Sequence, residues 1–141
     1  MIHVIGRVKT LHPLIHGGLL AVRGNTDDDH DIISYNIPLI DMVVVNLYPF
    51  KNVIEQSNTT LSRAVENIDI GGPSMIRSSS KNYSYVACCT NISQYSSITN
   101  ELQQNNGSLS LRTRYQLASQ AFAATAEYDS TIAVYLAKQS V

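Results

Sequence analysis

The chain has 141 residues, of which 44% are apolar and 15% are charged, and this balance excludes both a disordered and a fibrous protein. Its 10 basic and 11 acidic residues leave a net charge of -1, without the basic run that a nucleic-acid-binding surface requires. No apolar stretch reaches the ~18 residues of a membrane span, and the first ten residues lack a signal-peptide pattern. We therefore expect one globular, cytoplasmic domain that binds neither nucleic acid nor membrane.

Two apolar runs without alternation predict the strands of the fold. Before the first of these runs, residues 24–31 form a polar tract with four Asp, one Asn and one Gly, which predicts a loop. Residues 41–47 and 85–90 are continuous apolar runs, as in parallel strands covered by helices on both faces. In the second run, the neighbouring Cys88 and Cys89 would point to opposite faces, so we expect neither a disulfide nor a metal pair.

Helical periodicity predicts the remaining elements. An apolar stripe over 61–68 predicts a short helix capped by Thr59 or Thr60, and a second helix is expected to begin with Pro73 at its first position. A third helix over 95–102 should end at Asn105-Asn-Gly107.

The longest periodic segment extends from Leu111 to Leu136. It predicts one helix, or two helices divided at Asp129-Ser130. At ~1.5 Å per residue such a helix is longer than a small domain needs for its own core, so we expect it to pack on something outside this domain.

The first candidate site is segment 6–18, which combines basic and hydroxyl side chains with Gly and Pro. Its polar members are Arg7, Lys9, Thr10, His12 and His16. Cations beside hydroxyl and backbone N–H groups indicate a phosphate or oxyanion site, and the alternative is a solvated basic loop. The two histidines are four residues apart, but Pro13 lies between them and no third ligand is evident, so no metal site is expected.

Two further candidate sites follow the first predicted strand. Asn46 and Tyr48 lie at its carboxyl end, where ligands bind in open α/β sheets, although a strand-ending turn with a buried Tyr would give the same pattern. Asp69 precedes the Gly71-Gly72 helix start, whose free N–H groups would hold negative charge. Asp69 is therefore a candidate proton acceptor, whereas Lys81 could simply be a cation that is favoured by the helix dipole.

Three motifs in this order resemble one enzyme family over nearly the whole chain. The motifs are 6–13 (GRVKTLHP), 43–50 (VVVNLYPF) and 64–73 (AVENIDIGGP), followed by Arg77 and Ser80-Lys-Asn82. Together they resemble the inosine monophosphate (IMP) cyclohydrolase domain of the bifunctional purine biosynthesis enzymes. The resemblance implies a three-layer α/β fold of the methylglyoxal-synthase-like type with a mostly parallel sheet. Residues 1–107 would be part of that domain, and residues 108–141 a helical linker toward the transformylase domain.

The resemblance also implies a reaction and a set of site residues. The carboxamide nitrogen of 5-formamidoimidazole-4-carboxamide ribotide (FAICAR) attacks its formyl carbon, and water leaves to give IMP, without a metal or organic cofactor. The implied catalytic group is Lys81, as principal proton donor and acceptor, with Asp69, Tyr48 and Lys9. The implied substrate contacts are Arg7, Lys9 and Thr10 at the phosphate, and Val45, Asn46, Asp69 and Ile70 around the base.

The sequence also departs from the family pattern at both ends. The family carries a glycine-rich phosphate cradle before the segment that begins at Gly6, and a transformylase domain after the C-terminal helix. We therefore expect little activity from this chain alone, and the family implies a homodimer. The alternatives are a nucleotide-binding or anion-binding module without chemistry and a degraded fragment of the same enzyme.

Overall fold

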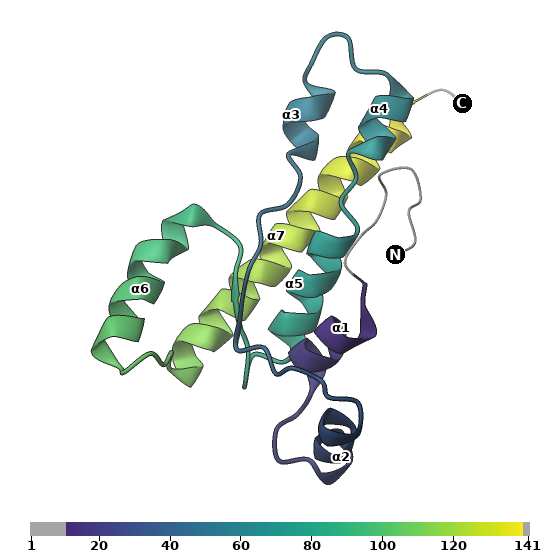
Figure 1. Ribbon diagram of the computed structural model, residues 1–141. Helices are drawn as coiled ribbons and strands as arrows, with labels where there is room; N and C mark the ends of the chain where they lie inside the picture. Colours follow the sequence, from purple (N-terminus) through teal and green to yellow (C-terminus); the bar gives the residue numbers. More distant parts are fainter. Residues whose placement is uncertain (1–10, 140–141) are drawn as a thin grey trace.

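The computed structural model of the chain describes residues 11–139 (Figure 1). Its elements follow one another as α1 (Pro13–Leu20), α2 (Thr26–Ser34), β1 (Met42–Val44), α3 (Phe50–Ile54), α4 (Leu61–Glu66), α5 (Gly71–Lys81), β2 (Ala87–Cys89), the 3-10 helix η1 (Ile92–Gln94), α6 (Tyr95–Gln104) and α7 (Leu111–Ala137). The predicted α/β class is confirmed. Within the described residues, no helix is both long enough and apolar enough to cross a bilayer.

The two predicted strands pair in parallel, with Val43 opposite Cys88. Each strand has only three residues, fewer than the apolar runs suggested. β2 is buried along its whole length, whereas Val44 of β1 is 53% exposed, so the prediction that both faces of both strands are covered is wrong for β1. The apolar side chains of β1 are only partly buried, because helices cover β2 more completely than they cover β1.

The adjacent cysteines lie on opposite faces of β2, as predicted, and both thiols are free. Cys88 packs with Ile76 and Ala121, and Cys89 belongs to the second core cluster, with Leu117 among its members. Burial raises the pKa of both thiols, so they are protonated, apolar core groups at neutral pH.

Helix α7 runs along the molecule as one continuous element (Figure 1). Of the two alternatives, the single helix is correct and the possible break at Asp129-Ser130 does not occur; residues 111–137 contain neither Pro nor Gly. The buried side of α7 contacts α5, β2 and α3 of the same chain, through residues such as Leu117 and Ala121. One face of α7 is therefore used within this chain, while Leu111, Tyr115 and Val134 on the same helix are more than half exposed. The expectation that the helix also packs on something outside the domain stays a prediction.

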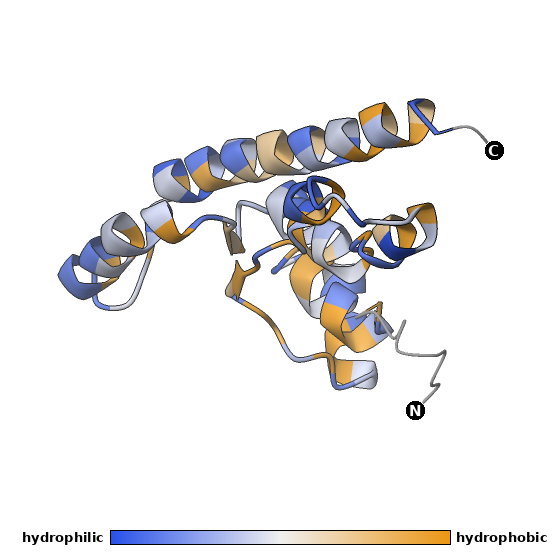
Figure 2. Cartoon of the chain, turned by 90° about the horizontal axis from the view of Figure 1, so that it is seen from above, coloured by the Kyte–Doolittle hydropathy of each residue, from blue (hydrophilic) through white to orange (hydrophobic). Residues whose placement is uncertain are grey.

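The shorter helices follow their local signals closely. Thr60 caps α4 by accepting a hydrogen bond from the Arg63 N–H at 3.2 Å. α5 begins at Gly71, two residues before the predicted start at Pro73. α6 ends before Asn106 and Gly107, which both have positive φ, as the predicted Asn-Asn-Gly terminator requires. In Figure 2, α1 is largely hydrophobic, whereas the outlying α6 is mostly hydrophilic.

The polar tract 24–31, predicted as a loop, instead contains the start of α2. The Asn25 side chain accepts hydrogen bonds from the N–H groups of Asp27 and Asp28 at 3.1 and 3.2 Å. Three aspartates in the first turn place negative charge at the positive end of the helix dipole, which stabilises the helix. The same polar residues that suggest a loop thus stabilise a helix start.

Candidate functional site

The phosphate-binding residues expected in the first motif, Arg7, Lys9 and Thr10, lie outside the described residues. The two histidines that follow have structural contacts. The His12 ring accepts a hydrogen bond from the Leu14 N–H at 3.3 Å and caps α1, and His16 is hydrogen-bonded to Ser78 of α5 at 2.9 Å. Over residues 11–139, no three His, Cys, Asp or Glu side chains gather in a metal-binding cluster.

The second and third motifs meet at Asp69. Asp69 is only 8% exposed, and one carboxylate oxygen accepts a hydrogen bond from the Gly72 N–H at 3.0 Å. The other oxygen accepts from the Tyr48 N–H at 3.4 Å. The carboxylate therefore joins the segment after β1 to the first turn of α5, where the helix dipole favours a negative charge.

Gly72 allows this close approach. A Cβ at position 72 would lie 2.5 Å from a carboxylate oxygen of Asp69 and 2.9 Å from a methyl carbon of Leu47. Both distances are shorter than van der Waals contact, so only glycine fits between these groups without displacing them. The glycine pair in the sequence thus has a steric role beside the carboxylate.

The surface beside Asp69 carries the remaining predicted contacts at the carboxyl end of β1. Tyr48 is 47% exposed and Ile70 is 48% exposed, Asn46 is exposed, and Val45 is half-buried. The alternative prediction of a buried Tyr48 is therefore wrong. We call this group the Asp69 corner; it comprises Val45, Asn46, Leu47, Tyr48, Asp69, Ile70, Gly71 and Gly72.

Tyr128 of α7 also reaches the Asp69 corner, although it is not among the site residues that the sequence predicts. The Asp69 N–H donates a hydrogen bond to the Tyr128 hydroxyl at 2.8 Å. Burial, together with the negative charges of Asp69 and Asp129, raises the pKa of Tyr128. The two groups lie 59 positions apart in the sequence, and neither helical nor strand periodicity reports such a contact.

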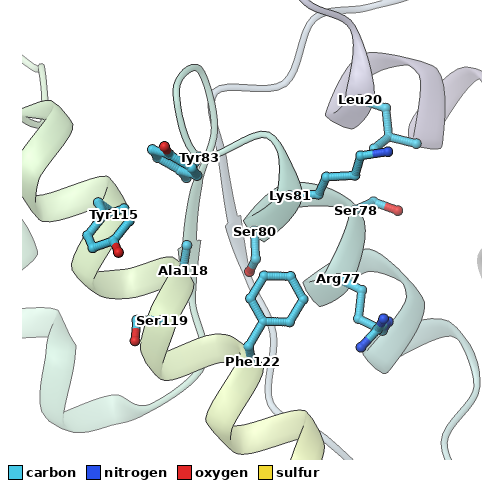
Figure 3. A pocket seen from close by; sticks show the side chains of 10 residues that line it. All are labelled: Leu20, Arg77, Ser78, Ser80, Lys81, Tyr83, Tyr115, Ala118, Ser119 and Phe122. Carbon is cyan, nitrogen blue, oxygen red and sulfur yellow. The ribbon is translucent and has the colours of Figure 1, made fainter.

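Lys81 lies elsewhere, at the last position of α5. It is exposed and borders a cavity of about 720 Å³ between α5 and α7 (Figure 3). The cavity is lined by Leu20, Arg77, Ser78, Ser80, Lys81, Tyr83, Tyr115, Ala118, Ser119 and Phe122. Its wall therefore carries two cations, of which Arg77 lies over the Phe122 ring at 5.6 Å.

Within one chain, the structure does not bring Lys81 together with Asp69. Asp69 precedes the first residue of α5, and Lys81 is its last residue. The length of the helix separates them by about 15 Å at ~1.5 Å per residue. Asp69 is also absent from the lining of the Lys81 cavity.

Comparisons with known proteins give a consistent result. The profile of the AICARFT/IMPCHase bienzyme family matches residues 79–141. Over 135 residues, 96% of this chain, the sequence is 50% identical to the bifunctional purine biosynthesis protein PurH of Chlorobium phaeobacteroides (strain BS1). It is also 50% identical, over 131 residues, to PurH of Listeria monocytogenes serovar 1/2a. The chain spans 26% of the length of each of these relatives.

A solved structure shares the fold. The crystal structure of ForH superposes with a TM-score of 0.82 at 32% sequence identity, and the match covers 94% of this chain and 68% of that chain. The arrangement of helices around the short parallel sheet is therefore found in a known protein.

Proposed function

Because the chain belongs to the family of the AICARFT/IMPCHase bienzymes, we propose that it carries part of an IMP cyclohydrolase site. The reaction is the ring closure of FAICAR to IMP. The fold we propose is methylglyoxal-synthase-like, with residues 1–107 in the catalytic domain and residues 108–141 as the helical segment that leads toward a transformylase domain.

The observation that carries this proposal is the Asp69 corner. Ring closure forms a bond from the carboxamide nitrogen to the formyl carbon and breaks a carbon–oxygen bond as water leaves. The carboxamide nitrogen must lose a proton, the formyl oxygen must be stabilised as it gains negative charge, and that oxygen must then leave as water while the formamide nitrogen loses its own proton and forms the C=N bond. The two protons given up by the nitrogens are the two that leave with the oxygen. A carboxylate beside a helix N-terminus, with a tyrosine next to it, provides groups suited to the first two tasks.

In this proposal each residue of the corner has a definite role. Asp69 accepts the carboxamide proton, and the Tyr48 hydroxyl donates a hydrogen bond to the formyl oxygen. Around the base, contacts come from Val45, Asn46 and Ile70. The phosphate is held by Arg7, Lys9 and Thr10, with Lys9 also in the catalytic group. Proton transfers and fixed dipoles suffice for this chemistry, so the proposal includes no metal or organic cofactor.

Lys81 requires a second copy of the chain in this proposal. The helix α5 places its backbone about 15 Å along the helix axis from the Asp69 corner of its own chain, and the cavity that it borders does not include Asp69. A homodimer in which the C-terminal end of one α5 approaches the Asp69 corner of the other would restore the full catalytic group. Lys81 would then protonate the departing hydroxide.

Replacement of Asp69 tests the proposed function directly. In the protein that carries this chain, D69N should lower the rate of ring closure by at least about 100-fold, because the proton acceptor is lost. The conversion is followed by the absorbance of the purine product. D27N changes an exposed aspartate of α2 and serves as the matched control, with unchanged turnover. Full turnover by D69N would contradict the proposal, and nucleotide binding without turnover in the unmodified protein would favour a binding module.

A further inference from the structure

We propose that Tyr128 is a positioning residue that holds both segments of the Asp69 corner in register. Its hydroxyl binds the turn that carries Asp69, and its ring packs against the segment that carries Tyr48. The structural part of this inference stands on the contacts alone, and its catalytic consequence rests on the proposed function.

The hydroxyl of Tyr128 bonds to both ends of the turn before α5. It accepts a hydrogen bond from the Asp69 N–H at 2.8 Å and lies 3.4 Å from the Asn67 carbonyl oxygen, to which it donates. A phenol can donate and accept at once, so one side chain fixes two backbone groups two residues apart. The direction of the Asp69 side chain follows from the backbone held in this way.

The phenol remains protonated, as this bridge requires. Burial raises the pKa of Tyr128, and the carboxylates of Asp69 and Asp129 raise it further. A pKa above the ordinary value of a tyrosine keeps the neutral form at physiological pH. A phenolate would lose its hydrogen bond to the Asn67 carbonyl oxygen, since it has no proton to donate.

The ring of Tyr128 reaches the other segment of the corner. It packs edge-to-face on Phe50, with the ring centroids 6.3 Å apart and an interplanar angle of 69°. Phe50 is 1% exposed, and its N–H donates to the Tyr48 carbonyl oxygen at 2.7 Å. Tyr128 therefore connects the segment after β1 with the turn before α5.

Tyr135, seven residues further along α7, provides a matched comparison. Its ring also packs edge-to-face on Phe50, at 5.7 Å and 85°. The described contacts of Tyr135 include no hydrogen bond from its hydroxyl to the Asn67–Asp69 turn. Removal of either hydroxyl leaves the aromatic ring in place, so Tyr128→Phe and Tyr135→Phe differ in their effect on this turn.

Hydrogen exchange of the Asp69 amide tests the structural part. In the unmodified protein this amide should be protected, and Y128F should exchange it about five- to tenfold faster, as expected for the loss of one hydrogen bond. Y135F should leave its exchange rate unchanged. Equal rates in the two variants, or an unprotected Asp69 amide in the unmodified protein, would overturn the inference.

Steady-state kinetics test the catalytic consequence. Y128F should lower kcat by up to about 100-fold through misplacement of Asp69, with KM for the ribotide and the melting temperature little changed. Y135F should keep the kcat of the unmodified protein. Faster Asp69 exchange with unchanged kcat would show that Tyr128 does not position the catalytic group. If the unmodified protein does not close the ring, the proposed function fails and the exchange comparison alone decides the inference.

Discussion

At the scale of single residues, the Asp69 corner depends on glycine at position 72, which has no Cβ. We expect Gly72→Ala to displace either the Asp69 carboxylate or the Leu47 side chain, because the new Cβ would lie within 3 Å of both. The overlap should cost about 1–3 kcal/mol of stability and most of the ring-closing activity. Urea denaturation and a turnover assay of the same preparation would measure the two effects.

Gly17→Ala is the matched control for this prediction. Gly17 also lies in a helix, but its Cβ would meet only the flexible side chain of Ile37, at 3.2 Å. This variant should therefore lose less stability than G72A and keep its turnover. Equal activity of G72A and the unmodified protein would show that the close contact at Gly72 is not needed.

Some contacts of the Asp69 corner can be predicted from the sequence, and the others cannot, for a physical reason. Asp69 and the glycine pair are adjacent in the chain, so their meeting at a helix start follows from local rules. Tyr128 approaches them through the packing of α7, which no local pattern encodes. The family resemblance alone groups Lys81 with Asp69, and within one chain they lie at opposite ends of α5.

At the scale of elements, the start of α7 depends on Glu101 of α6. Its carboxylate accepts a hydrogen bond from the Ser110 N–H at 2.7 Å and another from the Thr113 hydroxyl. The hydrogen bond from Thr113, with further hydrogen bonds from Ser110, lowers the pKa of Glu101 below its ordinary value. The ionised form is therefore favoured by folding.

This shift predicts an acid-sensitive contribution to stability. A depressed pKa stabilises the folded protein above the ordinary glutamate pKa, and the contribution disappears as the pH falls through the lower, folded-state value. Glu101→Gln should therefore lower the melting temperature at pH 7, and it should lose less stability than the unmodified protein as the pH falls below the ordinary glutamate pKa. E55Q, at the exposed end of α3, is the control. Identical pH dependence in E101Q and the unmodified protein would contradict this account.

Element boundaries follow from the sequence where local capping decides them. The predicted cap at Thr60 of α4 and the predicted end of α6 at Asn-Asn-Gly agree with the structure for this reason. The loop predicted around Asn25 is wrong because a polar cluster suits both a loop and a helix N-terminus. The strands proved shorter than their apolar runs, since burial by α5 and α7 extends beyond the paired residues.

At the scale of the whole molecule, the two ends of α5 carry different parts of the proposed machinery. The N-terminal end holds the Asp69 corner, and the C-terminal end holds Lys81 beside the cavity that α5 forms with α7. Within one chain, about 15 Å of helix separates the backbones of these two ends. The central claim is therefore that two copies complete each other's sites.

Mixing two inactive variants, K81M and D69N, tests this claim most directly. Each variant alone should be inactive. After the two are unfolded and refolded together, half of the dimers are mixed, and each mixed dimer holds one site with both native residues, so turnover should return to about a quarter of the unmodified value. A refolded mixture no more active than its separate components, or full turnover by K81M alone, would contradict the account.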